Sequence, residues 1–266
     1  GHSLLATQVL SRIRDMFSCE LTLRELFDSA TVSNLAERIE AHHPARPSAP
    51  PIHTIERAGS LPLSFAQQRL WFLHHLEEGH SATYNMPAAL RIEGPLDQDA
   101  LIQSLVALVE RHESLRTAFP MNDGTPSVQL SEADFQVAVI DMQDLPSEEQ
   151  TREAQRLINE DARRPFDLEQ GPLFRATLLR SGSDLHVLLV NMHHIISDGW
   201  SLGILIREFS TLYDAFLHNQ PSPLPPLPVQ YVDFAHWQRQ WLTGDVLDTQ
   251  VNYWKEQLAG APALLE

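Results

Sequence analysis

The residues best suited to chemistry lie in one short segment, His193-His194-Ile195-Ile196-Ser197-Asp198-Gly199. It follows an apolar run and precedes a helical pattern, and the end of a strand beside a turn is where open sheets place reactive groups. Because neighbouring side chains of a strand point to opposite faces, we expect His193 and His194 to have different roles. Asp198 could hydrogen-bond an imidazole, pair with an arginine or cap the next helix, and Gly199 suits a tight backbone. The segment is a candidate for acid–base catalysis.

A metal site is the main alternative for this segment, because histidine is the commonest zinc ligand and the chain has 13 histidines. The sequence has no His-Glu-x-x-His, and Cys19 is its only cysteine. One His-His-x3-Asp cannot complete a tetrahedral ligand set without distant help, so we predict no metal site. The other adjacent pairs, His42-His43 and His74-His75, are interpreted as solvated surface residues.

Ser3 is the second candidate. A serine before Leu4-Leu5-Ala6 is an ordinary helix N-cap, and Gly1-His2-Ser3 could also be a remnant of cloning. The same position would place a hydroxyl at the positive end of a helix dipole, which suits an attached phosphate group. The residues alone leave these alternatives open.

The N-terminal piece that carries Ser3 is predicted to be helical. A Thr22-x-x-Glu25 capping box starts the second helix. A third helix covers residues 31–40, with inward positions at Val32, Leu35, Ala36 and Ile39. The first helix has apolar residues at four-residue steps on one face: Leu5, Val9, Ile13 and Phe17. Three short helices form a partial bundle too small to fold well alone.

The rest of the chain mixes helices and strands. A Ser64-x-x-Gln67 capping box starts its first helix. The residues Ser181-Gly182-Ser183-Asp184, between two apolar runs, are typical of a β-hairpin turn. Further helices are predicted over 97–112, 147–161 and 200–217, and strands over 88–92, 127–130, 135–140, 173–179 and 185–192. This order predicts an α/β (α+β) sandwich with a mixed sheet.

Composition excludes several classes of protein. The 266 residues are 43% apolar and 20% charged, so a core can form without disulfides. Nineteen Lys and Arg against 35 Asp and Glu give a net charge of −16, which argues against nucleic acid and anionic membranes as partners. Without a membrane span or signal peptide, and with one cysteine, we expect a cytoplasmic protein.

Two proline clusters suggest the domain boundaries. The first lies at Pro44, Pro47, Pro50 and Pro51, and the second extends from Pro221 to Pro228. They predict a helical domain over 1–43, a linker over 44–58 and two subdomains, over 59–228 and 229–266.

Five stretches together resemble a known family. Gly1-His2-Ser3-Leu4-Leu5-Ala6 resembles the end of the attachment motif of peptidyl carrier domains, and residues 193–199 resemble the His-His-x-x-x-Asp-Gly signature of condensation domains of nonribosomal peptide synthetases. Three more core motifs of that family are matched in order, by residues 64–73, 111–119 and 231–239. Four ordered motifs behind a carrier motif are very specific.

This resemblance implies a fold and a reaction. The fold is that of a chloramphenicol acetyltransferase-like lobe, preceded by part of a carrier domain whose Ser3 bears 4'-phosphopantetheine. The activity is amide-bond formation between a carrier-bound donor and the amine of a second carrier-bound substrate. The resemblance implies that His194 is the main catalytic residue, as a proton acceptor or as the group that holds the amine, and that His193 and Gly199 shape the loop. Asp198 is expected to organise the site through a salt bridge to Arg111 or Arg116.

The resemblance also bounds the interpretation. The carrier motif lacks its usual preceding residues, and the condensation domain covers roughly half of the family's usual extent. Gly199-Trp200-Ser201 is similar to condensation domains that act on L-configured donors, which favours these over epimerisation domains. The partners implied are adenylation and downstream carrier domains and a phosphopantetheinyl transferase. The alternatives are a non-catalytic lobe that docks a carrier or recruits a partner, and an epimerisation-type relative.

Overall fold

The computed structural model divides the chain into two compact units, residues 1–50 and 51–266. It describes residues 3–17, 19–29, 31–41, 49–77, 81–122, 124–132 and 134–262. Residues 51–58 and 229–266 belong to the same unit as the sheet, and the finer division at 58 and 228 stays a prediction. Among the described residues, no helix combines the length and apolar character needed to cross a bilayer.

The first unit consists of the three predicted helices, α1 (Ser3–Phe17), α2 (Leu23–Asp28) and α3 (Val32–Ala41). The Thr22–Glu25 capping box is present before α2. The small core contains Ile13, Cys19 and Leu21, with Leu10, Leu35 and Ile39 packed against them.

The inward face predicted for α1 is wrong, because Leu5, Val9 and Phe17 are between 41% and 56% exposed. With 3.6 residues per turn, each four-residue step rotates by about 40°, so a strict four-residue stripe winds around the helix. The buried positions Ala6 and Ile13 instead combine steps of four and three residues through Leu10. Val32, expected to face inward on α3, is 85% exposed.

The second unit is built on a four-stranded mixed sheet in the order β1-β8-β7-β6. β8 pairs antiparallel with both β1 and β7, whereas β6 runs parallel to β7. The strands are β1 (Asn85–Glu93), β6 (Ala138–Asp141), β7 (Phe174–Arg180) and β8 (Leu185–His193). The predicted α/β fold with a mixed sheet is confirmed, including the hairpin that joins β7 to β8.

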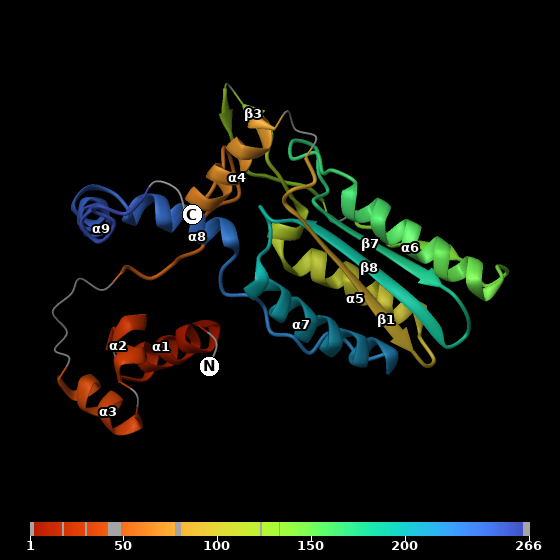
Figure 1. Ribbon diagram of the computed structural model, residues 1–266, viewed down its shortest axis with the longest axis horizontal. Coiled ribbons are helices and arrows are strands. Elements are labelled where there is room, and N and C mark those ends of the chain that lie inside the picture. The colour runs from red at the N-terminus through yellow and green to blue at the C-terminus, as the bar shows by residue number, and fades with distance from the viewer. Residues whose placement is uncertain are drawn as a thin grey trace. The chain divides into compact units, whose positions relative to one another are not determined.

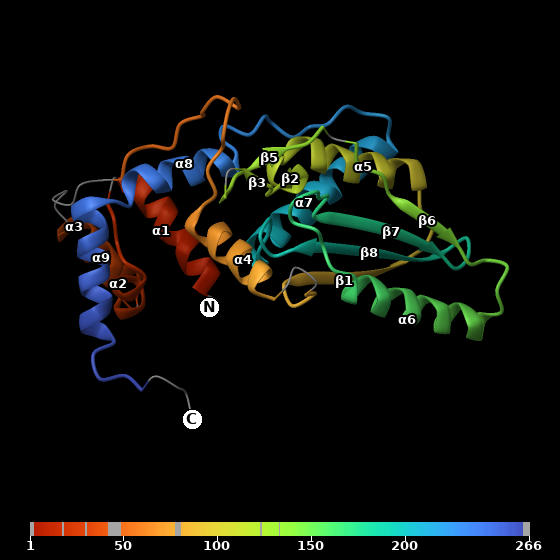
Figure 2. The same ribbon diagram turned by 90° about the horizontal axis from the view of Figure 1, so that it is seen from above.

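Helices cover both faces of this sheet (Figures 1 and 2). Leu178 of β7 pairs with Leu188 of β8 and packs in the main core, on the side of α5 and α7. The next pair, Leu179 and Val187, points to the opposite face and packs under α6. The three helices are α5 (Gln98–Arg111), α6 (Ser147–Arg163) and α7 (Gly199–Leu217).

Shorter elements surround the end of β8. The Ser64–Gln67 capping box starts α4 (Phe65–Leu76), as predicted. The predicted strand over 127–130 is reduced to β5 (Gln129–Leu130), which pairs with β2 (Thr117–Ala118), while Val128 makes an isolated bridge to Leu61. The remaining elements are η1 (Glu113–Arg116), β3 (Met121–Asn122), β4 (Thr125–Pro126), α8 (Tyr231–Trp241) and α9 (Gly244–Gln257).

A buried ion-pair network fixes α8 in this unit. Asp233 has no solvent exposure, and it accepts hydrogen bonds from the backbone N–H of Ile55 at 2.9 Å and from Nη1 of Arg57 at 2.6 Å. The same guanidinium bonds Glu113 through Nε at 2.9 Å. Because breaking a buried pair leaves an uncompensated charge, this network holds residues 55–57, η1 and α8 together.

Candidate active site

The two adjacent histidines lie where β8 ends, and the structure places them on opposite faces of the sheet. The backbone N–H of His193 donates to the carbonyl of Leu173 at 3.0 Å, and that of His194 donates to Tyr84 at 2.8 Å. His193 is fully buried, whereas His194 is exposed and lines a cavity. The alternation of side chains along a strand therefore separates the two rings, as predicted.

His193 is packed as a neutral ring. Its Nδ1 accepts a hydrogen bond from the backbone N–H of Ile195 at 3.1 Å, so the proton belongs on Nε2, which has no hydrogen-bond partner among the described residues. The ring of His74 lies 5.7 Å away, centroid to centroid, and Phe166 packs at 6.3 Å. Burial, followed by the neighbouring His74 and His194, lowers the pKa of His193 to about 3.

The interpretation of His74 and His75 as solvated surface residues is wrong. His74 is only 4% exposed because the last turn of α4 packs against His193. His75 stacks on Trp71 with a centroid separation of 3.8 Å, and its Nε2 lies 3.5 Å from a carboxylate oxygen of Glu169. The other pair, His42-His43, lies outside the described residues.

His194 has the opposite tautomer. Its Nδ1 lies 2.7 Å from the carbonyl oxygen of Ser197, and a carbonyl can only accept, so the proton of the neutral ring belongs on Nδ1. The Nε2 of a neutral His194 therefore carries a lone pair. A lone pair on a ring that lines a cavity is what a proton acceptor requires.

Asp198 caps the helix that follows. Its Oδ1 accepts hydrogen bonds from the backbone N–H and the hydroxyl of Ser201, at 2.8 and 2.6 Å. Burial disfavours the carboxylate, but the hydrogen bonds from Ser201, with the neighbouring His194, outweigh it and lower the pKa of Asp198. Asp198 is therefore charged at neutral pH, at the N-terminus of α7.

The predicted salt bridge from Asp198 to Arg111 or Arg116 is wrong. Arg111 donates through Nε to Glu208 at 3.1 Å, and Arg116 donates to the carbonyl of Ser131 at 2.8 Å. Glu208 lies ten residues beyond Asp198, which is about 15 Å along α7. Arg111 ends α5, and α5 packs alongside α7, so its guanidinium meets the middle of α7 rather than the cap.

Gly199 starts α7 without a special backbone conformation. Its φ is not positive, and a Cβ added to it would meet no described atom within 4 Å. The expectation that Gly199 serves a tight backbone is therefore wrong.

The cavity beside His194 has a volume of about 750 Å³. One wall is apolar and includes Leu70 and Leu73 of α4 and Leu205 of α7. Polar side chains line much of the rest, and each of the four motifs contributes at least one of them: Gln67, His112, Ser114, His194, Asp198 and Tyr231. Ser201 and Glu208, on α7 beyond the third motif, also line the cavity. An apolar pocket with a few convergent polar groups is the usual form of a substrate site.

Among these polar lining residues, His194 and Asp198 were predicted as site residues, and the others, including Glu208 and Tyr231, were not. Glu208 accepts from both Arg111 and the ring of His112, whose Nε2 lies 2.7 Å from Oε2. Tyr231 starts the fourth motif, so the motif locates it in the sequence, but nothing in the motif indicates which of its side chains faces a cavity.

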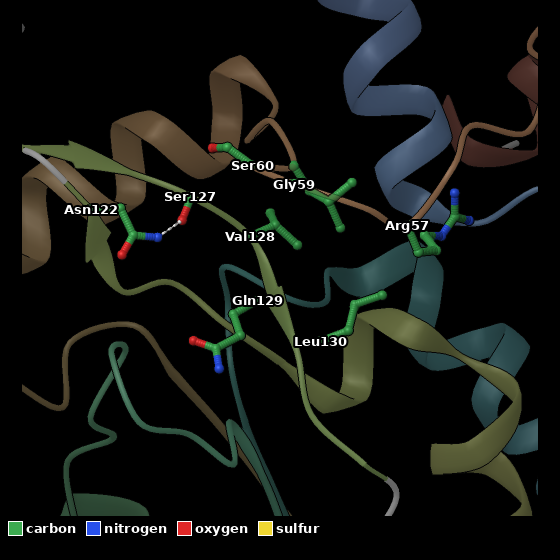
Figure 3. Close-up of a pocket in the computed structure, with 9 residues that line it drawn as sticks. Arg57, Gly59, Ser60, Asn122, Ser127, Val128, Gln129 and Leu130 are labelled. Atoms are coloured by element: carbon green, nitrogen blue, oxygen red, sulfur yellow. Dashed lines mark hydrogen bonds between the residues drawn. The ribbon is translucent and has the colours of Figure 1, made fainter.

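A second hollow, of about 330 Å³, has neither His193 nor His194 among its lining residues. Figure 3 shows the residues that line it. Asn122 donates to the hydroxyl of Ser127 across one side of it, at 2.6 Å. Its one charged lining residue, Arg57, is already bonded to Asp233 and Glu113. This hollow therefore offers polar walls without a free charged group.

Ser3 is the first residue of α1, a helix of 15 residues. Its side chain, with Gly1 and His2, lies outside the part of the chain that the structure describes. Within that part, no group of three or more His, Cys, Asp or Glu side chains could hold a metal ion.

Comparisons with known proteins match two families to successive parts of the chain. The Condensation domain family matches residues 57–266, and the Phosphopantetheine attachment site family matches residues 1–39. The chain is 48% identical over its whole length to a polypeptide of the linear gramicidin synthase of Brevibacillus parabrevis, of which it covers 4%. It is 42% identical over its whole length to a dimodular nonribosomal peptide synthase of Bacillus subtilis, of which it covers 11%. The chain thus spans a small part of these relatives.

Solved structures share the fold. The starter condensation domain of rhizomide synthetase RzmA matches 77% of this chain and 49% of its own, with a TM-score of 0.69 and 20% identity. The X-domain in a complex with OxyB from teicoplanin biosynthesis matches 84% of this chain and 49% of its own, with a TM-score of 0.67 and 27% identity. The chain therefore covers about half of each matched fold.

Proposed function

Because this chain belongs to the condensation-domain family of nonribosomal peptide synthetases, and a phosphopantetheine attachment domain precedes that domain, we propose that it forms amide bonds. The donor is an aminoacyl or peptidyl thioester, and the acceptor is the amine of a second carrier-bound substrate. The cavity beside His194 is the proposed place of reaction.

The observation that carries this proposal is the 2.7 Å contact between Nδ1 of His194 and the carbonyl oxygen of Ser197, which assigns the tautomer of the neutral ring. The Nδ1–H of this ring is held by the carbonyl of Ser197, which leaves Nε2 free to accept a proton inside the cavity. As the amine attacks the donor carbonyl, the C–N bond forms, the C–S bond breaks and the amine gives up a proton, which Nε2 can accept. A positioned proton acceptor contributes about 10² to 10⁴ in rate.

The positions of the reactants are expected to matter as much as the proton transfer. Holding two reactants in line can be equivalent to about 10⁵ M or more of effective concentration. The apolar wall formed by Leu70, Leu73 and Leu205 excludes water from one side of the cavity and orients the substrates against His194.

Ser3 is the proposed attachment residue for 4'-phosphopantetheine. Its place at the start of α1 fits a phosphate, because free N–H groups and the helix dipole favour an anion there. When attached, this group supplies the thiol that holds the donor. The partners that follow are a phosphopantetheinyl transferase, an adenylation domain and a downstream carrier domain.

Two measurements on the full-length synthetase test the proposal. Incubation with coenzyme A and a phosphopantetheinyl transferase should add one phosphopantetheine mass at this carrier, and Ser3→Ala should abolish it. Amide product should then form from loaded donor and acceptor, and His194→Ala should reduce its rate. Equal rates in the wild type and His194→Ala would contradict the catalytic role of His194.

A second candidate function is recruitment of a partner enzyme without catalysis. It is favoured by the likeness to the X-domain whose solved structure is a complex with OxyB. The two functions differ in the product that they predict. A recruiting module would yield no amide product in the wild type, while still binding a partner enzyme with measurable affinity.

A further inference from the structure

Tyr231 is another of the polar residues on the wall of the cavity that His194 lines. It is the first residue of α8, in the fourth condensation motif, and its hydroxyl lies 3.0 Å from the hydroxyl of Ser64. The buried residues of α8 are Val232, Asp233 and Ala235, so Tyr231 is not one of its core residues.

The direction of the Ser64–Tyr231 hydrogen bond follows from counting donors. Ser64 is fully buried, and its Oγ already accepts from the backbone N–H of Gln67 at 3.1 Å. Its own hydrogen needs an acceptor, and among the described residues the Tyr231 oxygen is the one within reach. Ser64 therefore donates, which leaves the hydrogen of Tyr231 for another acceptor.

No acceptor for that hydrogen lies among the described residues. Burial raises the pKa of Tyr231, the bond from Ser64 offsets part of this effect, and the charge of Asp198 adds to it. The phenol is therefore protonated at neutral pH and remains a donor. A hydrogen-bond donor on a cavity wall without a protein acceptor is available to a ligand.

Rigid contacts hold this donor in a fixed relation to His194. Ser64 is the N-cap of α4, and its backbone N–H donates to Oε1 of Gln67 at 3.0 Å. The amide nitrogen of Gln67 lies 3.4 Å from the carbonyl of Ile195, the residue after His194. One buried cap thus connects α8 to the loop that carries His194, as a preorganised site requires.

We propose that Tyr231 is a catalytic residue that donates a hydrogen bond to the carbonyl oxygen of the donor thioester. This inference rests on the proposed condensation activity. As the amine attacks, negative charge grows on that oxygen, and the Tyr231 O–H stabilises it while His194 accepts the amine proton. When the C–S bond breaks, the carbonyl re-forms and the departing sulfur takes the proton, so Tyr231 ends unchanged.

The test uses the full-length synthetase with both carriers loaded and compares single-turnover rates of amide formation. Tyr231→Phe keeps the ring and removes the donor, and we expect its rate to fall by about 10²-fold, as for the loss of one oxyanion donor. The matched control is Tyr213→Phe in α7, which removes a hydroxyl that accepts from the backbone N–H of Asp97 at 3.1 Å, outside the cavity. Its rate should stay at the wild-type level.

Two further readouts separate catalysis from a structural role. Tyr231→Phe should lower kcat without raising the KM for the loaded acceptor, and should leave the loading of Ser3 unchanged. Its melting temperature should also fall, because the variant removes the acceptor of the buried Ser64 hydroxyl. Replacement of Tyr231 by 4-aminophenylalanine, which retains an N–H donor of similar reach, should restore part of the rate.

The outcomes distinguish this inference from the proposed function. If wild-type protein forms amide and His194→Ala does not, but Tyr231→Phe matches Tyr213→Phe, the role of Tyr231 is disproved while the proposed function stands. If 4-aminophenylalanine is no better than phenylalanine, donation by residue 231 is also disproved. If the wild type forms no amide, the proposed function fails and this inference fails with it.

Discussion

His193 and His194, at the end of β8, are the same residue type in different surroundings. On the His193 side, the ring has no exposure, is packed by His74 and Phe166, and has a pKa lowered to about 3. On the His194 side, the ring is exposed to a cavity of about 750 Å³. Because neighbouring side chains of a strand point in opposite directions, one of two adjacent histidines is structural and the other is a candidate catalytic residue.

The hydrogen bonds sharpen this difference. The Nδ1 of His193 accepts from a backbone N–H, and the Nδ1 of His194 donates to a carbonyl, so the two neutral rings are opposite tautomers. The Nε2 of His193 is buried among packed side chains, whereas His194 lines a cavity. The motif alone does not assign a role to either histidine. The hydrogen-bond partner of Nδ1 does, because it decides whether Nε2 carries a proton or a lone pair.

The largest effect is expected for the rate of amide formation when His194 is changed to Asn. The shorter amide can still donate to the carbonyl of Ser197, so the loop is retained while the proton acceptor at the Nε2 position is lost. We expect the single-turnover rate to fall by about 10² to 10⁴. The unfolding free energy, measured by urea denaturation, should change by less than about 1 kcal/mol because the ring is exposed. A rate near that of the wild type would contradict the role of His194 as proton acceptor, and with it the difference in role between His193 and His194.

The next largest effect is on stability when His193 is changed to Ala. The variant leaves a cavity beside His74 and removes the acceptor of the Ile195 N–H. We expect a loss of about 3 kcal/mol in the unfolding free energy. Urea denaturation of the protein measures it, with His194→Ala as the control. Equal losses in the two variants would contradict the comparison.

Acid should affect the two sides differently. The unfolded chain takes up a proton on residue 193 below pH 6.5, whereas the folded ring stays neutral down to about pH 3. Stability due to this ring is therefore complete above pH 6.5 and falls as the pH decreases, by about 1.4 kcal/mol per unit. Urea titrations between pH 6.5 and 4.5 should show a shallower pH dependence in His193→Ala. The same slope in wild type and variant would contradict the buried neutral ring.

The smallest effect concerns Asp198 and Arg111. Because Arg111 bonds Glu208 and Asp198 bonds Ser201, the two share no partner. Asp198→Ala alone should cost about 1 kcal/mol through loss of the helix cap. In a double-mutant cycle with Arg111→Ala, the coupling energy should stay below about 0.5 kcal/mol. A coupling energy of several kcal/mol would instead support the salt bridge between Asp198 and Arg111 that the sequence predicted.

Local patterns in the sequence predicted much of the fold. The capping boxes at Thr22 and Ser64 and the hairpin between β7 and β8 depend on residues a few positions apart, and the structure has all three. The inward face of α1 was wrong because a four-residue step does not match the helical period. Short-range chemistry thus predicted elements better than it predicted their buried faces.

The candidate site divides in the same way. The sequence determined the family, the motif that holds His193 and His194, and their opposite directions, because each depends on order along the chain. Only the tertiary structure decided that His74 is buried beside His193, that Arg111 pairs with Glu208, and that Ser64 meets Tyr231. The last two contacts join residues 97 and 167 positions apart. Such contacts depend on how helices pack against one another, and no local pattern encodes that packing.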